Sequence, residues 1–364
     1  MSAGQEKNLL DGVRILDLTR VMSGPFCTAM LADLGAEVIK VEMPGFGEEG
    51  RHFAPFKDDE SAYFLLLNRG KRSITVDLKS NEGVALIHAL AAKSDVLVEN
   101  FRPGVMKRLG LDHESLLAAN PRLIYASISG FGQNGPFSDL PAFDLVIQAM
   151  SGLMSLTGPR DGAPTAVGES IADICTGMFA SWGVLAALFE RERTGKGRHL
   201  EVAMLDSVFA MLLTSLSRRL YIGEMPQRVG NRHPETYPVD SLPTRDGGIV
   251  IVAFSDAIFA TVARVVEQPD LSQDARFVDN AARNANEAAL RAILARWTET
   301  KSTEEALARF RAAGVPCAPI WSLDDLLQSG YIAARGMIVQ GRNSALGDIP
   351  LVPQPVIFAG APRP

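Results

Sequence analysis

The stretch VRILDLTRVMSGPFCTAMLADLGAEVIKVE (13–42) decides the fold class. VRILDLT is an apolar run of strand length, GPFCTAMLADLG has helical spacing and closes on a glycine, and EVIKVE again resembles a strand. A strand, a helix and a second strand in this order form a βαβ unit, in which the two strands are parallel. The opening of the chain therefore predicts an α/β fold.

The same alternation continues through the following residues. RSITVDL, DVLVENF, LIYASISGF and HLEVAM have the composition of strands. Helical segments are expected at 80–93, 113–121, 144–156, 171–191 and 206–221. We predict a large domain over 1–222, built on a Rossmann-like parallel sheet with helices on its faces.

Proline, glycine and charged residues become frequent in GEMPQRVGNRHPETYPVDSLP (223–243), as expected of a linker between domains. A smaller α+β domain is predicted over 244–330. It begins with a hairpin around Asp246-Gly247 and continues with helices near 257–266, 287–297 and 303–313, a strand at 315–321 and a helix at 322–336. The tail, 331–364, is expected to return to the large domain.

Composition limits the class of protein. Of 364 residues, 47% are hydrophobic and 21% are charged, which is ordinary globular usage. The net charge of −6 gives no general attraction to nucleic acid or anionic membranes, so neither is expected as a partner. The uncharged run at 174–189 is shorter than the roughly 17–25 residues of a membrane span. It predicts a buried core helix.

Cysteine usage and the N-terminal residues bear on the compartment. Cys27, Cys175 and Cys317 are odd in number and far apart, as expected of free thiols in a reducing environment. MSAGQEKNLLDG has no basic start followed by an apolar run, so a secretory signal is not expected. These features predict a cytoplasmic location.

Several common site motifs are missing. Glu42 ends the second strand where a ribose-binding acid would stand, but TRVMSGPFCTAM lacks the G-x-G-x-x-G turn that admits a pyrophosphate. This weakens the interpretation as a nucleotide-binding oxidoreductase. No P-loop, G-x-S-x-G or H-E-x-x-H occurs, and the five histidines are expected to stand singly. No metal site and no bound prosthetic group are predicted.

One acid stands out in GESIADICTGMFASWGVLAALFERE (168–192). Asp173 heads an uncharged apolar run, where an ionised group needs a partner, a place at a helix end or a catalytic task. In the first turn of a helix it would be favoured by the helix dipole and would cap free amides. The residues alone leave both the capping and the catalytic interpretation open.

Two basic clusters follow predicted strands. NRGKRSITVDLK carries Arg69, Lys71, Arg72 and Lys79, and ENFRPGVMKRLG carries Arg102, Lys107 and Arg108. Ligands of parallel sheets bind outside the carboxyl ends of the strands, so 100–108 and the loop 19–24 are expected to border one crevice. A phosphate-bearing ligand accounts for both clusters, and a solvated surface is the alternative.

The chain resembles the class III CoA-transferases, the family that includes formyl-CoA transferase, carnitine CoA-transferase and the α-methylacyl-CoA racemases. The resemblance rests on LDGVRILDLTRVMSGPFCTAMLADLGAEVIKVE, KRSITVDLK, SDVLVENFRPGV, NPRLIYASISGFGQNGP, IADICTG and TGKGRHLEVAMLDSV, and more weakly on GVPCAPI. These blocks cover most of the first 210 residues in the family's order.

The resemblance implies that Asp173 is a nucleophile that carries CoA from an acyl-CoA thioester to a free carboxylic acid through a covalent intermediate. Amides at the start of its helix, in the turn that includes Gly177, are candidates for stabilising the oxyanion. CoA and acyl-CoA would be substrates, and the chain would form an interlocked homodimer. The residues that match the family's CoA contacts are Val21, Met22, Val76, Asp77, Leu78, Lys79, Asn100, Phe101, Arg102, Arg108 and Met204.

Two departures from the family pattern carry expectations of their own. A CoA-contacting arginine of formyl-CoA transferase aligns with Met43 or Pro44, so Lys71 or Arg72 is expected to take over the phosphate contact. The glycine-rich flap of that enzyme is missing as well, which disfavours formate and oxalate.

The main rival reaction is racemisation of a 2-methylacyl-CoA. The racemases use a histidine where PAFDLVIQAM has Phe143, and phenylalanine cannot exchange a proton, so we expect transfer. A CoA-binding protein without catalytic activity is a further alternative, which the retained aspartate of IADICTG disfavours.

Overall fold

The computed structural model describes residues 8–360, which divide into two compact units. The large unit takes the described parts of Met1–Met154, Ala166–Glu224 and Ile332–Pro364, and the small unit takes Ser155–Thr165 and Met225–Tyr331. Each unit is described by itself below.

A six-stranded sheet organises the large unit, with strand order β5-β2-β1-β6-β7-β8 and every neighbouring pair parallel. The strands are β1 (Arg14–Asp17), β2 (Glu37–Glu42), β5 (Lys71–Thr75), β6 (Val96–Glu99), β7 (Ile124–Ser129) and β8 (His199–Ala203). The four residues of β6 and the six of β7 are all buried, as expected of central parallel strands. The α/β class predicted from the sequence is confirmed.

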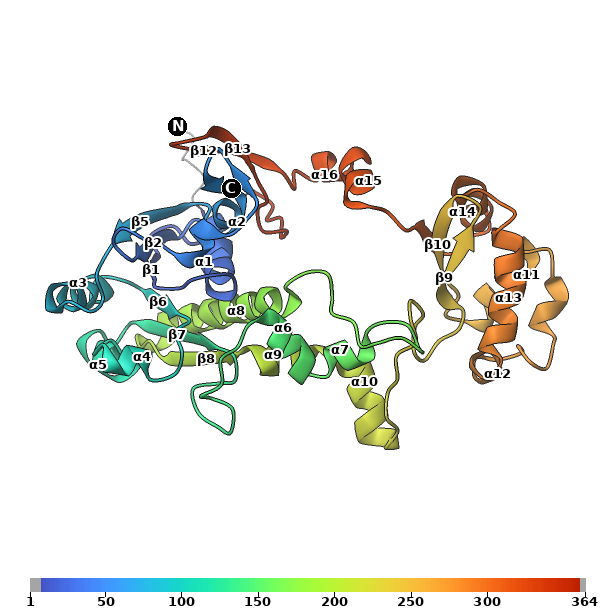
Figure 1. The fold of residues 1–364 in the computed structure, drawn as a ribbon, viewed down its shortest axis with the longest axis horizontal. Coiled ribbons are helices and arrows are strands. Elements are labelled where there is room, and N and C mark those ends of the chain that lie inside the picture. Colours follow the sequence, from blue (N-terminus) through green and yellow to red (C-terminus); the bar gives the residue numbers. More distant parts are fainter. Residues whose placement is uncertain (1–7, 361–364) are drawn as a thin grey trace. The chain divides into compact units, whose positions relative to one another are not determined.

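Helices cover both faces of this sheet (Figure 1). α1 (Ser23–Asp33) and α8 (Ile171–Thr194) pack on one face through Cys27, Leu31, Ala180 and Val184. α3 (Asn81–Ala91), α4 (Val105–Arg108) and α5 (His113–Ala119) cover the other face. Because the strands are parallel, their carboxyl ends share one edge of the sheet, where the segments 18–22 and 100–104 follow β1 and β6.

Close packing explains one glycine of α8. A Cβ atom on Gly177 would lie 2.6 Å from the carbonyl oxygen of Ser23, so only glycine lets α8 approach the start of α1 this closely. Gly177 thus sets the spacing between the two helices that carry Ser23 and Asp173.

The described residues contain one helix, α8, that is long and apolar enough to cross a membrane. Half of its most apolar window is buried within the unit, where it packs on α1 and on the sheet. Its composition fits the core helix expected from the sequence.

Two predicted helices are interrupted. The segment 144–156 forms α6 (Asp144–Met150) and α7 (Leu153–Leu156), separated at Gly152, whose φ is 91°. The segment 206–221 begins earlier than predicted and forms α9 (Met204–Met211), α10 (Leu213–Ser217) and the π-helical segment η2 (Arg218–Ile222). Leu212 leaves the helical region with ψ of 31° and separates the first two.

Short elements that the sequence analysis did not predict complete the large unit. They are η1 (Glu49–His52), β3 (Phe56–Lys57), β4 (Glu60–Ser61), α2 (Ala62–Leu67) and the tail hairpin of β12 (Val339–Asn343) and β13 (Gly347–Leu351). The tail is bonded to the large unit, because the backbone N–H of Gln354 donates to Asp33, which also forms a buried ion pair with Arg69.

The small unit is built on the antiparallel sheet β11-β10-β9, with β9 (Val239–Thr244), β10 (Gly247–Val252) and β11 (Cys317–Pro319). Its helical elements are α11 (Asp256–Val265), η3 (Pro269–Ser272), α12 (Asn280–Ala285), α13 (Glu287–Thr298), α14 (Thr303–Ala312) and α15 (Leu323–Gln328). The following α16 (Tyr331–Ala334) begins at the unit's last residue. Apolar side chains of β10, α11, α13 and α14 form its core.

Candidate active site

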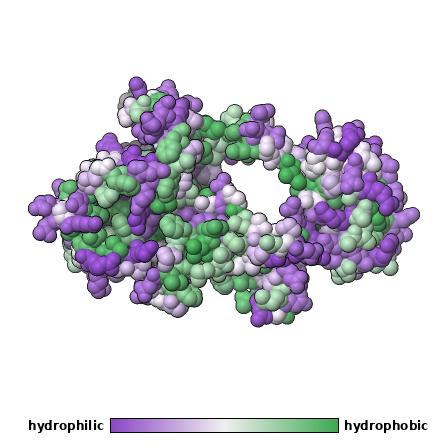
Figure 2. Space-filling model, viewed as in Figure 1, coloured by the Kyte–Doolittle hydropathy of each residue, from purple (hydrophilic) through white to green (hydrophobic). Residues whose placement is uncertain are grey.

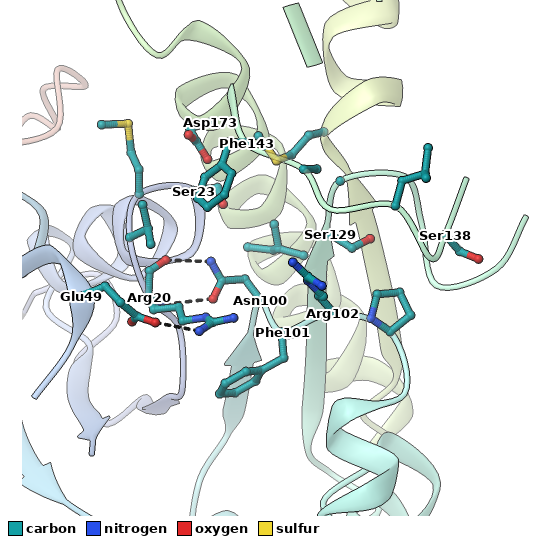
Figure 3. Close-up of a pocket in the computed structure, with 18 of the residues that line it drawn as sticks. Arg20, Ser23, Glu49, Asn100, Phe101, Arg102, Ser129, Ser138, Phe143 and Asp173 are labelled. Atoms are coloured by element: carbon teal, nitrogen blue, oxygen red, sulfur yellow. Dashed lines mark hydrogen bonds and ion pairs between the residues drawn. The ribbon is translucent and has the colours of Figure 1, made fainter. Parts of the chain in front are cut away.

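A cavity of about 350 Å³ opens at the carboxyl ends of β1, β6 and β7 (Figure 3). It is lined by Arg20, Val21, Met22, Ser23, Glu49, Phe53, Asn100, Phe101, Arg102, Pro103, Ile128, Ser129, Gly130, Ser138, Leu140, Ala142, Phe143, Asp173 and Met204. This is where ligands of parallel sheets bind.

Asp173 stands in the first turn of α8 with its carboxylate beside Ser23. Burial raises the pKa of this carboxyl group to about 6, and the negative charge of Asp144 adds to the effect. The nearby hydroxyl and backbone N–H of Ser23 favour the ionised form and lower the pKa, which opposes the shift. The cavity therefore holds a partly desolvated carboxylate that is ionised at neutral pH.

Asp144 supplies the cap at the start of α8. Its Oδ1 accepts the backbone N–H groups of Ala172 and Asp173, at 2.7 and 3.3 Å, and its Oδ2 accepts from Gln148 at 2.6 Å. The N-cap residue Ser170 makes no side-chain capping bond. Because a neighbouring helix occupies these amides, the Asp173 carboxylate is left for other contacts, and the capping interpretation loses its basis.

The loop between β1 and α1 is held from several sides. The Asn100 side chain accepts the Arg20 N–H at 2.9 Å and donates to the Arg20 carbonyl at 2.8 Å. The Arg20 guanidinium pairs with Glu49 at 2.7 Å and lies 5.2 Å from the centre of the Phe101 ring. These contacts, visible in Figure 3, fix the backbone that leads to Ser23.

A second cavity, of about 330 Å³, shares Arg20, Glu49 and Phe101 with the first. Val76, Asp77, Leu78 and Lys79 line it, together with apolar residues that include Val41, Met43, Phe46, Val105 and Leu109. The two cavities thus adjoin at the Arg20–Glu49 ion pair. An apolar chamber on one side and a carboxylate chamber on the other suit an elongated ligand with a reactive end.

The structure brings together most of the residues singled out in the sequence. Val21, Met22, Asn100, Phe101, Arg102, Met204 and Asp173 line the first cavity, and Val76, Asp77, Leu78 and Lys79 line the second. Arg108 lies at the end of α4 and lines neither of these two cavities.

The expectation that Lys71 presents its charge to a phosphate is wrong. Its side chain is 1% exposed and its Nζ lies 3.0 Å from the carboxylate of Asp17, at the end of β1. Burial lowers the pKa of Lys71 to about 8. Burial alone would raise the pKa of Asp17, but Lys40 and Lys71 bring it well below its usual range. Inside the protein, the charge of Lys71 is thus offset by that of Asp17.

The exposed guanidinium of Arg72 lies 3.3 Å from the carboxylate of Glu37. It lines neither of the two adjoining cavities. The phosphate contact that the sequence analysis assigned to this residue therefore has no support in its position.

The sequence of the chain matches the pattern of CoA-transferase family III over residues 10–364. It is 43% identical over 359 residues to acetyl-CoA:oxalate CoA-transferase of Acetobacter aceti, covering 98% of this chain and 91% of that protein. It is 41% identical over 350 residues to succinyl-CoA:glutarate CoA-transferase of Mus musculus, covering 96% and 80%.

The chain belongs to CoA-transferase family III. The fold agrees: a CaiB/BaiF family protein from Brucella suis superposes with a TM-score of 0.87 at 38% identity, over 98% of this chain and 95% of that one. The resemblance found in the sequence is confirmed, and the protein is a class III CoA-transferase.

Two residues near the carboxylate of this CoA-transferase were not found from sequence. Ser23 lies in the loop that was expected to border the crevice, but nothing in its local sequence links it to Asp173. The pKa of Tyr63 is raised by burial and then by the charges of Asp173 and Glu48, which places its ring in the same electrostatic environment. Only the folded chain brings these residues together.

Every histidine was expected to stand singly, but two histidines of the CoA-transferase are in contact. His113 and His199 stack with ring centres 3.9 Å apart, and the His199 Nε2 lies 3.0 Å from the Ser127 hydroxyl. Both histidines line a third cavity, of about 640 Å³, which Glu99 at the end of β6 also lines. Burial raises the pKa of Glu99 to about 7.

Among the residues from 8 to 360, no group of three or more His, Cys, Asp or Glu could hold a metal ion.

Proposed function

We propose that this enzyme transfers CoA from an acyl-CoA thioester to a free carboxylic acid through covalent intermediates on Asp173. The observation that carries the proposal is the position of Asp173. Its carboxylate does not cap the helix, because Asp144 does so, and it lines a cavity of ligand size. The chain also belongs to a CoA-transferase family. The relatives named above transfer CoA between acids, according to their names.

The chemistry follows from a carboxylate nucleophile. An Asp173 oxygen attacks the thioester carbonyl carbon, the C–S bond breaks, and CoA leaves as the thiolate while a mixed anhydride forms. The thiolate then attacks the aspartyl carbonyl, releasing the first acid and leaving an aspartyl-CoA thioester. The acceptor carboxylate attacks this thioester to form a second anhydride, and the returning thiolate takes its acyl group. Asp173 is regenerated as the free carboxylate.

The surroundings of Asp173 support this role. A carboxylate with a pKa of about 6 is ionised at pH 7, yet it is a stronger nucleophile than a fully solvated one because fewer waters hold its charge. The polar groups of Ser23 stand beside the carboxylate and favour its ionised form. The oxyanion contact proposed for the turn at Gly177 finds no support, because Gly177 packs against Ser23 and Asp144 takes the amides of Ala172 and Asp173.

The adjoining cavities support a path for CoA. The nucleotide end would lie against Val76, Leu78 and Phe101 in the apolar cavity, with Lys79 exposed at its edge for a phosphate. Pantetheine would pass the Arg20–Glu49 pair and bring the thioester to Asp173. In this arrangement Lys79→Ala raises the KM for acyl-CoA with little change in kcat, and more so at low salt.

The names of the relatives suggest which acids accept CoA. Oxalate and glutarate are both dicarboxylates, and the name of the Acetobacter aceti relative removes the reason for disfavouring oxalate. We propose that dicarboxylates are among the acceptors. Arg102 supports this choice, since its exposed side chain lines the cavity that holds Asp173.

Racemisation is not favoured. Phe143 lines the cavity next to Asp173 (Figure 3), in the place where the racemases have a proton-exchanging histidine. Incubation with (R)-2-methylacyl-CoA in heavy water is expected to leave the α-hydrogen unexchanged.

We propose that the enzyme acts as a homodimer, with interlocked chains, in the cytoplasm. Large apolar side chains are exposed along the large unit, and Figure 2 shows hydrophobic residues gathered on its visible face. The exposed apolar residues of the large unit include Trp182 and Phe189 of α8, Phe209 of α9, Leu213 of α10 and Tyr221 of η2. Apolar surface of this extent fits a partner subunit.

The decisive experiment follows oxygen from the acceptor acid into the protein. With ¹⁸O in both oxygens of the acceptor carboxylate, the second anhydride contains an ¹⁸O bridge, and attack of the thiolate on the acyl carbon leaves that oxygen on Asp173. Mass analysis of the IADICTG peptide after turnover with succinyl-CoA and labelled glutarate or oxalate should show a gain of ¹⁸O.

Variants complete the test. Asp173→Asn should lose label incorporation and several orders of magnitude of transfer rate while still binding CoA. Asp206→Asn is the matched control, because Asp206 also stands in the first turn of a helix and lines neither adjoining cavity. Transfer without label in Asp173, or normal transfer by the asparagine variant, would remove Asp173 as the nucleophile.

A further inference from the structure

Val21 adopts a backbone conformation that its side chain disfavours. Its φ is 64°, in the left-handed region, where a β-branched residue meets steric conflict. It lies in the loop between β1 and α1, two residues before Ser23, and it lines the cavity that holds Asp173. Strained backbone persists only where the surroundings hold it, and it gathers at active sites.

Glu48 makes the contact that holds Val21. Its Oε1 accepts the Val21 N–H at 2.8 Å and the Gly50 N–H at 2.7 Å. Glu48 is 4% exposed, and its Oε2 has no hydrogen-bond partner among the described residues, although the Lys40 Nζ lies 3.4 Å away. A buried carboxylate is costly, so its place beside a strained residue calls for a role.

The residues around Val21 are fixed as well. Lys40 donates to the Thr19 carbonyl at 2.8 Å, and Asn100 binds both the N–H and the carbonyl of Arg20. On the other side, a Cβ on Gly24 would lie 2.4 Å from the Thr19 side chain, so the loop folds back on itself with no spare room. Val21 is the point where the chain turns, and a change in its φ would redirect the residues that follow.

We propose that Glu48 is a positioning residue that locks Val21 in its left-handed conformation and thereby sets Ser23 against the Asp173 carboxylate. Glu48 lines the adjoining apolar cavity but not the cavity that holds Asp173, so its effect on Asp173 passes through the backbone of Val21. The inference rests on the proposed function, because it assigns Ser23 to orienting the nucleophile of that reaction.

The test uses glycine, which adopts positive φ without steric cost. Glu48→Ala should lower kcat about 10²-fold, the cost of misplacing a reacting group by roughly 1 Å, with a smaller change in the KM for acyl-CoA. Val21→Gly alone, which also removes a side chain that lines the cavity, is measured as the reference, and adding Glu48→Ala to it should lower kcat much less than Glu48→Ala lowers that of the parent, since glycine needs no lock. In the double variant, Val21→Gly should restore kcat at least about tenfold relative to Glu48→Ala.

Val21→Ala is the matched control. It removes the branched side chain but keeps a Cβ, so positive φ stays disfavoured and Glu48→Ala should not be rescued. Glu48→Gln, which retains an oxygen acceptor for the Val21 N–H, should keep more activity than Glu48→Ala. Circular dichroism and thermal unfolding confirm that each variant is folded.

The outcomes separate two failures. Equal rescue by alanine and glycine would show that side-chain bulk matters rather than backbone freedom, and no rescue by glycine in a folded double variant would show that Glu48 acts only as a cap for η1. Either result overturns the role of Glu48 and leaves the nucleophile assignment standing. Loss of that assignment is measured separately by ¹⁸O incorporation in the parent enzyme.

Discussion

The Asp173 carboxylate stands where its own charge is disfavoured. Burial and the neighbouring Asp144 both favour the protonated form, and the hydroxyl and N–H of Ser23 oppose them. The pKa of about 6 leaves the group ionised at neutral pH but protonated in mild acid. Nucleophilicity and stability should therefore respond to pH in the same range.

The first prediction concerns activity. Because only the ionised carboxylate attacks, kcat/KM for acyl-CoA should fall as pH is lowered through about 6, whereas an ordinary aspartate would hold its activity down to about 4. The rate at low acyl-CoA concentration, measured from pH 3.5 to 8, gives the position of this limb. A limb near pH 4 would contradict the environment described for Asp173.

The second prediction concerns stability. A carboxyl group whose pKa is raised from 3.8 to about 6 destabilises the folded state once it ionises, so the penalty is absent below pH 3.8, grows up to about pH 6 and is complete above it. Asp173→Asn removes the charge and should raise the free energy of unfolding at pH 7 by at most about 3 kcal/mol. Denaturant titrations at pH 4 and pH 7 should show the gain at the higher pH only. An equal or negative effect at pH 7 would contradict it.

The sequence led to some of these residues and could not lead to others. Asp173 was recognisable because an acid at the head of an apolar run is unusual and because IADICTG resembles a known family. Glu48 looked like one of two adjacent acids in PGFGEEG, and Tyr63 like an ordinary aromatic. Their roles arise from contacts between distant segments, such as the bond between Glu48 and Val21, which are 27 positions apart, and no local pattern encodes these contacts.

The start of α8 depends on a side chain from another helix. Asp144 begins α6 and caps α8 through the N–H groups of Ala172 and Asp173. It does two things that can be separated by substitution, because its oxygen atoms satisfy the amides while its charge raises the pKa of Asp173.

The third prediction separates them. Asp144→Asn keeps an oxygen acceptor for the α8 amides and removes the charge, so the acid limb of kcat/KM should move to lower pH, while its new N–H group faces the Gln148 donor and costs some stability. Asp144→Ala removes the acceptor and should cost about 1 kcal/mol of unfolding free energy. The pH profile and thermal unfolding of the two variants are compared. An unchanged limb in the asparagine variant would mean that burial alone sets the pKa of Asp173.

The fourth prediction concerns the end of β6. Burial raises the pKa of Glu99 from 4.5 to about 7, so its ionisation destabilises the fold as pH rises through that interval. Glu99→Gln keeps an acceptor for the Phe101 N–H and should stabilise the enzyme above pH 7 by up to about 3 kcal/mol, with no gain at pH 4. Unfolding at the two pH values measures the difference. A gain that is equal at both would point to packing rather than to charge.

Some helices and strands could be predicted from their sequence, and others could not. β6 and β7 were predictable because strands buried on both faces read as continuous apolar runs. The break at Gly152 was not, since a glycine within a helical pattern is compatible with an unbroken helix until its φ is known. β3 and β4, with two residues each, carry too little pattern to detect.

The exposed apolar side chains of α8 and η2 lead to the fifth prediction. Trp182 and Tyr221 are 69% and 89% exposed in the single chain, which is unfavourable for a lone subunit in water. Light scattering should give twice the chain mass of 39.2 kDa at micromolar concentration. In a variant with Trp297 and Trp321 replaced by phenylalanine, the fluorescence of Trp182 should be shielded from an aqueous quencher. A monomer with an accessible Trp182 would contradict the proposed homodimer.

The chain passes between its two units four times, and this has a consequence for synthesis on the ribosome. The main segment of the small unit, Met225–Tyr331, leaves the ribosome before Ile332–Pro364, which belongs to the large unit. The bond from Gln354 to Asp33 joins residues 321 positions apart, so the large unit gains this contact only after the main segment of the small unit has been synthesised. Closing such a loop is slow, because its entropy is lost before the contact is gained. We therefore expect the small unit to resist proteolysis on stalled nascent chains while the large unit is still cleaved.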